Sequence, residues 1–311
     1  MKSRTIVHFR NGIGNFVSFT PALQALASMD TSGKVDMCIE KDWMDSRKGG
    51  LFELWDSYPF INKTISFDEI VQKGKDYKTW FWSSWSTHGE PKEYFSSKHF
   101  YSDKGWDQTE VHESEYYMNL VREWYGYTGQ TPKQFIPVAT RPVINTHKKI
   151  IVLSNGGFGY LIPLKKYSRF KDLAKCLRDW FGETVHIVKI GYGSELSDVD
   201  IYDEDYVWKL SITETAKVIQ QATLVITNDT GNMHVADALN VPQIVLWGGS
   251  VVEKNQPING NNKIIHLGLP CQPCQPQGGY RNCANSACMN DIQVGEIMFH
   301  VRKFFHEGKF K

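Results

Sequence analysis

Residues 224–247 read LVITNDTGNMHVADALNVPQIVLW, and this stretch decides the fold class. Its apolar, β-branched runs at 224–227 and 243–247 predict two buried strands. The residues between them, 232–239, have the apolar spacing of a short helix. Because strands and helices alternate, we expect an α/β protein with a parallel sheet.

The same alternation extends to both sides of this stretch. The predicted elements of the C-terminal half are strands at 149–153 and 185–190 and helices at 167–181, 212–221 and 294–305. Together they predict one Rossmann-like domain over residues 146–293, followed by a C-terminal helix within 294–311.

A strand, a glycine turn and a helix also open the chain. Residues 5–9 are β-rich, Gly12 and Gly14 follow them, and residues 16–29 carry apolar side chains at helical spacing. This unit is how a doubly wound sheet usually begins. Further elements of this half are predicted as strands at 35–39 and 79–82 and a helix at 111–127.

Three prolines mark the boundary between the two halves. Pro132, Pro137 and Pro142 lie within residues 128–149, among threonine, glutamine and asparagine residues. Such a stretch is typical of an interdomain linker. We therefore expect a first Rossmann-like domain over residues 1–140.

Length and charge narrow the function classes. The 311 residues suit two α/β domains, and 41% hydrophobic with 22% charged residues is typical of a globular protein. A net charge of +1 argues against a protein that wraps nucleic acid by bulk charge. No apolar run approaches the roughly 20 residues that cross a bilayer, and residues 1–10 lack the core of a signal peptide. We expect a cytoplasmic protein, with peripheral contact at the inner face of a membrane left open.

The most specific motif lies where the strand at 224–227 gives way to a helix. In open α/β sheets, ligands bind outside the carboxyl ends of the strands. The backbone N–H groups of Thr230 and Gly231 would stand at a helix N-terminus, which favours an anion such as a diphosphate, and His234 follows about one turn later. The alternative is that Asp229 only caps the helix and His234 only packs within it.

Four of the six cysteines form a second motif. Cys271, Cys274, Cys283 and Cys288 have the spacing Cys-x2-Cys-x8-Cys-x4-Cys. Four thiolates on one loop can complete a tetrahedral Zn²⁺ or iron site, whose role would be structural because no coordination position stays open. The alternative is that these cysteines are reduced or paired in disulfides.

Residues 77–106 are unusually rich in aromatic side chains. Sugar rings and bases both stack on tryptophan and tyrosine, and Lys92, Lys98 and Lys104 lie among these rings, which would suit an anionic acceptor. The alternative is an irregular core cluster that absorbs many of the rings.

The motif at 229–236 resembles the signature of a known family. Asp229-Thr230-Gly231, His234 and Ala236 are similar to the signature of the bacterial lipopolysaccharide heptosyltransferases, which move heptose from ADP-heptose. Other motifs agree in order along the chain: the turn at 10–15, Ile162-Pro163 with Tyr167, Gly191 with Glu195, and the four cysteines. The resemblance covers the first 30 residues and most of the C-terminal half, while residues 40–130 match poorly.

This resemblance implies a GT-B fold, in which two Rossmann-like domains with parallel sheets face a central cleft. It implies that the N-terminal domain binds the acceptor, that the C-terminal domain binds the nucleotide sugar, and that transfer inverts the anomeric centre without a catalytic metal. The residues it assigns to the donor are Gly14, Asn155, Gly156, Gly157, Lys166, Gly191, Glu195, Asp229, Thr230, Gly231 and His234.

The chain departs from the family pattern at two positions. The family has an aspartate as general base where this chain has Asn15, and a neutral amide cannot take a proton from a hydroxyl. Asn15 could still orient a substrate, and we predict Asn15 and His88 as the catalytic residues; other candidates for the base are His99, Asp103 and His112. The family also has a lysine where this chain has Tyr160, so that Lys165 or Lys166 would have to replace it.

We therefore expect a glycosyltransferase that moves a sugar from a nucleotide sugar to a hydroxyl of a glycan, a protein or a modified nucleobase. One alternative is a sugar-nucleotide-binding protein that has lost transfer, as Asn15 would suggest. Another is a GT-B-type epimerase that acts on the nucleotide sugar itself. The nucleotide, the sugar and the oligomeric state are left open by the sequence.

Overall fold

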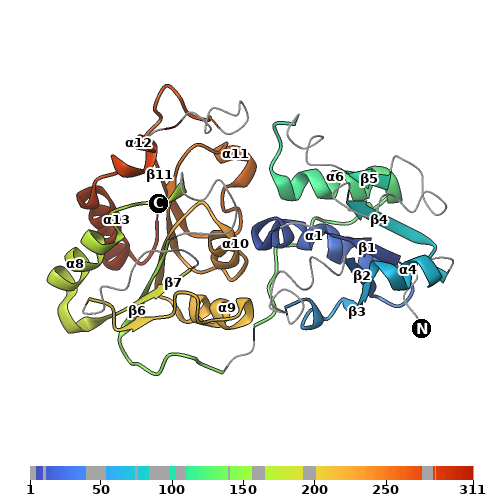
Figure 1. Cartoon of the computed structure of the whole chain (residues 1–311), viewed down its shortest axis with the longest axis horizontal. Helices are drawn as coiled ribbons and strands as arrows, with labels where there is room; N and C mark the ends of the chain where they lie inside the picture. The colour runs from blue at the N-terminus through green and yellow to red at the C-terminus, as the bar shows by residue number, and fades with distance from the viewer. Residues whose placement is uncertain are drawn as a thin grey trace. The chain divides into compact units, whose positions relative to one another are not determined.

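The computed structural model describes residues 5–9, 12–39, 54–73, 76–83, 99–101, 109–138, 141–155, 165–191, 201–274, 283 and 285–310. The chain divides into two compact units, Met1–Pro137 and Val138–Lys311. Each unit is built on a sheet whose described strand pairs are all parallel (Figure 1). The expected α/β fold is therefore confirmed.

The sheet of the first unit has five strands in the order β3-β2-β1-β4-β5. The strands are β1 (Thr5–His8), β2 (Val35–Ile39), β3 (Ile61–Ser66), β4 (Thr79–Ser83) and β5 (Phe100–Tyr101), and the longer helices are α1 (Ile13–Met29), α4 (Phe67–Lys73) and α6 (Glu113–Tyr125). The strand order reverses beside β1, because β2 pairs on one side of it and β4 on the other. Helix α1 begins just after β1, at the point where such sheets bind ligands.

Aromatic side chains fill the core of the first unit. Phe9 stacks on Phe19, and Phe81 packs against both Phe19 and Tyr101. Trp80, Phe81, Trp82 and Tyr101, all from the aromatic stretch at 77–106, are buried. These four rings therefore support the core interpretation, while most of the remaining stretch lies outside the described residues.

The sheet of the second unit has six strands in the order β11-β10-β9-β6-β7-β8. The strands are β6 (Lys149–Ser154), β7 (Val185–Ile190), β8 (Glu204–Asp205), β9 (Leu224–Asn228), β10 (Gln243–Trp247) and β11 (Asn262–His266). The α-helices are α8 (Phe170–Phe181), α9 (Ile212–Gln221), α10 (Gly231–Ala238), α11 (Val252–Asn255), α12 (Ala287–Asn290) and α13 (Val294–Glu307). The C-terminal helix α13 packs beside α8 on this sheet (Figure 1).

The central strands of both sheets lie close to their predicted positions, whereas the edge strands were not predicted: the two-residue strands β5 and β8, and the longer β3 and β11. The sequences of β3 and β11, INKTIS and NKIIH, are largely polar. Only one side chain of β11, Ile265, is buried. A strand exposed along one side needs few apolar residues, so its hydrophobic pattern is weak.

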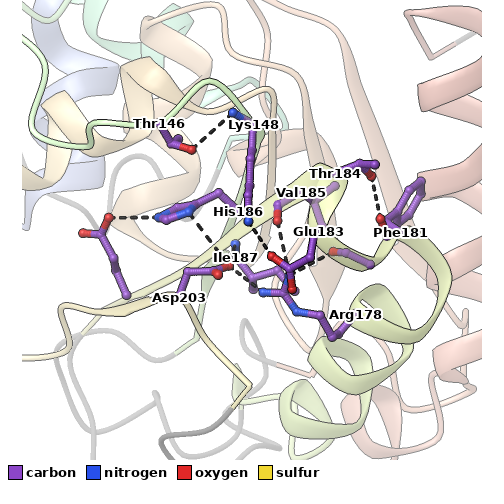
Figure 2. A network of polar contacts seen from close by, with 12 residues as sticks. Thr146, Lys148, Arg178, Phe181, Glu183, Thr184, Val185, His186, Ile187 and Asp203 are labelled. Atoms are coloured by element: carbon purple, nitrogen blue, oxygen red, sulfur yellow. Dashed lines mark hydrogen bonds and ion pairs between the residues drawn. The ribbon is translucent and has the colours of Figure 1, made fainter.

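A polar network fastens the short edge strand β8 to the second unit (Figure 2). The Asp203 carboxylate accepts a hydrogen bond from the Ile187 N–H and one from Arg178 of α8, both at 2.6 Å. His186 of β7 lies 2.9 Å from the Glu204 carboxylate. Burial favours the neutral form of Asp203, but the Ile187 N–H and Arg178 outweigh it and hold the pKa of this carboxyl below its ordinary value. The chain that enters β8 is thus held along β7.

Within the part of the chain that the structure describes, no helix is both long and apolar enough to span a membrane.

Candidate functional site

Three segments meet at the carboxyl edge of the second sheet. Strands β9, β6 and β7 are neighbours in this order, and all run parallel. Asp229, Asn155 and Gly191 directly follow these three strands. Three of the predicted donor residues therefore lie at the edge where open α/β sheets bind ligands.

The N-terminus of α10 is a feature of this edge that suits an anion. Thr230 is the N-cap residue, with an extended backbone at φ −151° and ψ 177°, and its side chain makes no capping hydrogen bond. The first turn of the helix, which begins at Gly231, contains no acidic side chain. Backbone N–H groups and the helix dipole at this end favour a negatively charged ligand.

Asp229 is held by an ion pair. Its carboxylate lies 2.6 Å from the Lys165 ammonium and accepts a hydrogen bond from the Ser250 hydroxyl. Burial alone would raise the pKa of Asp229, but Lys165, Ser250 and His234 together keep it below its ordinary value. The interpretation of Asp229 as a helix cap is therefore wrong, because Thr230 occupies the cap and Asp229 pairs with Lys165.

Lys165, next to the predicted Lys166, is the lysine that pairs with Asp229 at this edge. Its side chain is 18% exposed, whereas that of Asp229 is 6% exposed. Lys166 makes no ion pair among the described residues. Sequence reasoning left the two lysines open because adjacent residues on a loop carry no periodic pattern that tells them apart.

Asn155 and Gly191 shape the middle of the edge. The Asn155 side-chain amide donates to the Tyr167 carbonyl at 3.1 Å and accepts from the Tyr167 N–H at 3.3 Å. Gly191 has φ +128°, and a Cβ at this position would meet the Asn155 carbonyl oxygen at 2.5 Å. Glycine is therefore required where the two segments approach each other closely.

Two further buried polar residues belong to this region, His234 on α10 and Asn228 at the end of β9. His234 is buried, and its charge interaction with Asp229 lowers the pKa of that carboxyl. Asn228 ends β9, is fully buried, and has no hydrogen-bond partner for its side-chain amide among the described residues. A buried amide without a partner is costly, which makes Asn228 a residue that a ligand would satisfy. Its signal in the sequence was a polar residue at the end of an apolar strand.

In the first unit, Asn15 contacts a carboxylate that the sequence did not reveal. The Asn15 amide donates to Glu113 Oε1 at 2.7 Å, and the Tyr117 hydroxyl donates to the same oxygen at 2.8 Å. Glu113 is only 2% exposed and is the first residue of α6, while Asn15 and the buried Gly14 lie in the first turn of α1. The carboxylate absent at position 15 is thus present on a neighbouring helix.

The cysteine cluster belongs to the second unit. All six cysteines of the chain are free thiols. Burial, together with the neighbouring Cys274, Cys283 and Cys271, raises the pKa of Cys288 to about 11, so the four thiols lie close enough to interact. Among the described residues, however, no group of three His, Cys, Asp or Glu side chains has the arrangement of a metal site.

Four predicted site residues, His88, Gly156, Gly157 and Glu195, lie outside the described residues and remain predictions.

The ion pair predicts that replacing its two partners lowers the unfolding free energy by unequal amounts. Replacing Lys165 with methionine leaves the buried Asp229 carboxylate unpaired and should cost about 3–5 kcal/mol of unfolding free energy. Replacing Asp229 with asparagine should cost less, about 1–2 kcal/mol, because the Lys165 ammonium can reach water and the amide can still accept from Ser250. Urea unfolding of the two variants at pH 7 measures the difference.

The pH dependence follows from the same contact. Because the folded state lowers the pKa of Asp229, this carboxylate stabilises the protein above its ordinary pKa, and the contribution is lost as the pH falls through the folded value. In the Lys165→Met variant the lysine no longer offsets burial, so the pKa of Asp229 should rise, and acidification through that pKa should restore part of the lost stability. A larger loss for Asp229→Asn than for Lys165→Met at pH 7 would contradict this account of the pair.

Comparison with known proteins shows what this chain is similar to. Residues 206–283 match the model of glycosyltransferase family 9 (heptosyltransferase). Lipooligosaccharide heptosyltransferase 2 of Campylobacter jejuni is 28% identical over 98 residues, which are 30% of this chain and 30% of that protein. The matched segment thus spans less than a third of this curated relative.

Solved structures are similar over nearly the whole chain. A family 9 glycosyltransferase from Veillonella parvula has a TM-score of 0.74 at 16% identity, covering 99% of both chains. The Escherichia coli ADP-heptose lipopolysaccharide heptosyltransferase II has a TM-score of 0.65 at 16% identity, covering 90% of this chain and 97% of the other. The iron-containing dodecameric glycosyltransferase TibC from enterotoxigenic E. coli has a TM-score of 0.64 at 12% identity, covering 99% and 77%. The chain therefore has a GT-B fold like that of the heptosyltransferases, and the sequence of residues 206–283 is similar to that of glycosyltransferase family 9.

Proposed function

We propose that this protein is an inverting glycosyltransferase that uses a nucleoside-diphosphate sugar. The observation that carries the proposal is the N-terminus of α10. The Thr230 side chain makes no capping hydrogen bond there, and the Lys165 ammonium pairs with the preceding residue, Asp229. This arrangement fits a diphosphate leaving group. We take the donor to be ADP-heptose, since a structural neighbour is described as an ADP-heptose heptosyltransferase.

Different groups at this edge would bind different parts of the diphosphate. The backbone N–H groups of Thr230 and Gly231 would hold one phosphate, and His234 lies on the same helix. The Lys165 ammonium has three N–H donors, of which Asp229 takes one, so the others can reach a phosphate oxygen. Negative charge grows on the diphosphate as the glycosidic bond breaks, and these groups would stabilise it there.

The two neighbouring lysines provide a matched test of this assignment. Replacing Lys165 with methionine should weaken ADP binding about tenfold to a hundredfold, the effect of losing one hydrogen bond to a charged group. Replacing Lys166 with methionine should leave the affinity unchanged. Isothermal titration with ADP measures both, and equal affinities for the Lys165→Met variant and the unmodified chain would contradict the assignment.

We further propose that the N-terminal unit binds the acceptor and that Glu113 is the general base. The neutral Asn15 amide cannot take this role. The Glu113 carboxylate would take the proton of the acceptor hydroxyl while the hydroxyl oxygen attacks the anomeric carbon. The bond from this carbon to the diphosphate breaks, and its electron pair leaves on the phosphate oxygen, so the configuration inverts. Asn15 and Tyr117 would orient the carboxylate through their hydrogen bonds to Oε1. His88 remains the other predicted catalytic residue.

Removing the base should reduce turnover without affecting the donor site. Replacing Glu113 with glutamine should lower kcat at least a hundredfold, within the usual range for a general base, and leave the Kd for ADP unchanged. The double variant Asn15→Asp with Glu113→Gln moves the carboxylate back to position 15 and should recover part of the activity. Release of ADP from ADP-heptose, with a heptose-accepting lipooligosaccharide as the probe, measures the activity of both variants. Isothermal titration measures the Kd for ADP.

The same experiment includes a control variant and tests an alternative function. The Tyr117→Phe variant loses one hydrogen bond to Glu113 and should retain most of the activity. Unchanged kcat in Glu113→Gln would remove Glu113 from the mechanism. If the unmodified chain binds ADP but releases none from ADP-heptose with this acceptor, the sugar-nucleotide-binding function suggested by Asn15 gains support. A lipooligosaccharide acceptor would also bring the protein to the inner face of a membrane.

We also propose that Cys271, Cys274, Cys283 and Cys288 hold a structural Zn²⁺ or iron ion. Their four sulfur donors suit a tetrahedral site of either metal, and the contribution of the neighbouring thiols to the raised pKa values of Cys274 and Cys288 supports their proximity. A structural neighbour, TibC, is described as iron-containing. Such an ion would join the segment around Cys274 to α12, which contains Cys288.

Elemental analysis of the purified protein tests the metal site. We expect about one zinc or iron per chain, lost in the Cys274→Ser variant, since three thiolates bind the ion far more weakly than four. The Cys176→Ser variant, whose thiol lies on α8, is the control and should keep its metal. A metal-free protein purified without chelators would contradict the proposal.

A further inference from the structure

Trp208 lies at the same sheet edge as the proposed diphosphate site. After β8 the chain continues along β7, where the Tyr206 N–H donates to the Lys189 carbonyl at 2.8 Å and the Trp208 N–H donates to the Gly191 carbonyl at 3.2 Å. Gly191 directly follows β7, so this contact places Trp208 beyond the carboxyl end of the strand.

The fold holds this side chain in an unfavourable state. Trp208 is 61% exposed, whereas Trp55, Trp80, Trp82 and Trp247 are all buried. Its backbone has φ +62°, in the left-handed region, which costs about 1–3 kcal/mol for a residue other than glycine. An exposed indole on a strained backbone is a feature that folding itself does not favour, which suggests a ligand.

Hydrogen bonds and ion pairs keep the turn around Trp208 in place. The Val207 N–H donates to the Asp205 carboxylate at 2.9 Å, and the Lys209 N–H donates to the Tyr206 carbonyl at 3.1 Å. The strand before the turn is fastened by the network of Arg178, His186 and Asp203 (Figure 2). The turn is therefore organised before any ligand arrives, which lowers the entropic cost of binding.

The spacing to the helix N-terminus fits one kind of ligand. Strand β6 lies between β9 and β7, so the ends of β9 and β7 are two strand spacings apart, or about 10 Å. A phosphate at Thr230 and a flat ring at Trp208 would thus be separated by a distance that a ribose can bridge. We propose that Trp208 stacks on the base of the donor nucleotide. This inference rests on the proposed function, and it identifies the residue that grips the base.

Trp180 is a matched control within the same unit. It is 60% exposed, but it lies near the end of α8, which precedes β7 and therefore ends at the opposite, amino edge of the sheet. The Arg302 guanidinium lies 4.5 Å from the centre of its ring. Removing Trp180 thus removes an equally exposed indole without touching the proposed base site.

The test compares a ligand that has a base with one that has none. Isothermal titration of the full chain would use ADP and inorganic pyrophosphate, with the variants Trp208→Ala, Trp208→Phe and Trp180→Ala. Trp208→Ala should weaken ADP binding about tenfold to a hundredfold, the effect of losing one stacked base, and leave pyrophosphate binding unchanged. Trp208→Phe should keep most of the ADP affinity, and Trp180→Ala all of it.

Each contrary result has a distinct meaning. ADP affinity that is unchanged in Trp208→Ala overturns the stacking role alone. Equal weakening of ADP and pyrophosphate also overturns it, because the effect would then be on the fold or the phosphate site. If the unmodified chain binds neither ligand, the proposed function fails, and the inference fails with it.

Discussion

The ion pair between Lys165 and the buried Asp229 carboxylate is the contact on which the proposed donor site depends. It joins the segment that follows β6 to the segment that follows β9, and these two strands are neighbours in the sheet. A carboxylate buried this deeply needs a partner, so the position of Lys165 is set by folding rather than by a ligand. Because the Asp229 side chain pairs with Lys165, the backbone N–H groups of Thr230 and Gly231 are left as the donors at the N-terminus of α10.

The first unit shows how a carboxylate can be kept when its usual position is lost. An aspartate at position 15 would face Glu113 and repel it, whereas the Asn15 amide donates a hydrogen bond to it. Asn15 and Glu113 are therefore compatible as a pair, and the departure at position 15 does not by itself imply lost activity. Each unit then contributes one charged group held by hydrogen bonds: Glu113 in the first and Lys165 in the second.

The sequence predicts the buried parts of this protein better than its edges and its long-range contacts. Strands such as β9 are apolar throughout because both of their faces are covered, and the helix start at Thr230 follows from the strand before it. The polar edge strand β3 has no such pattern. Glu113 lies 98 residues from Asn15, and no local pattern reports a contact that two separate helices create. The choice between Lys165 and Lys166 likewise depends on the tertiary structure.

A crystal structure of the chain with ADP would test the central claim most directly. The account predicts the diphosphate against the backbone N–H groups of Thr230 and Gly231, with the Lys165 ammonium within hydrogen-bond distance of a phosphate oxygen while it keeps its contact with Asp229. ADP bound elsewhere on the chain, or a first turn of α10 that makes no contact with phosphate, would contradict it.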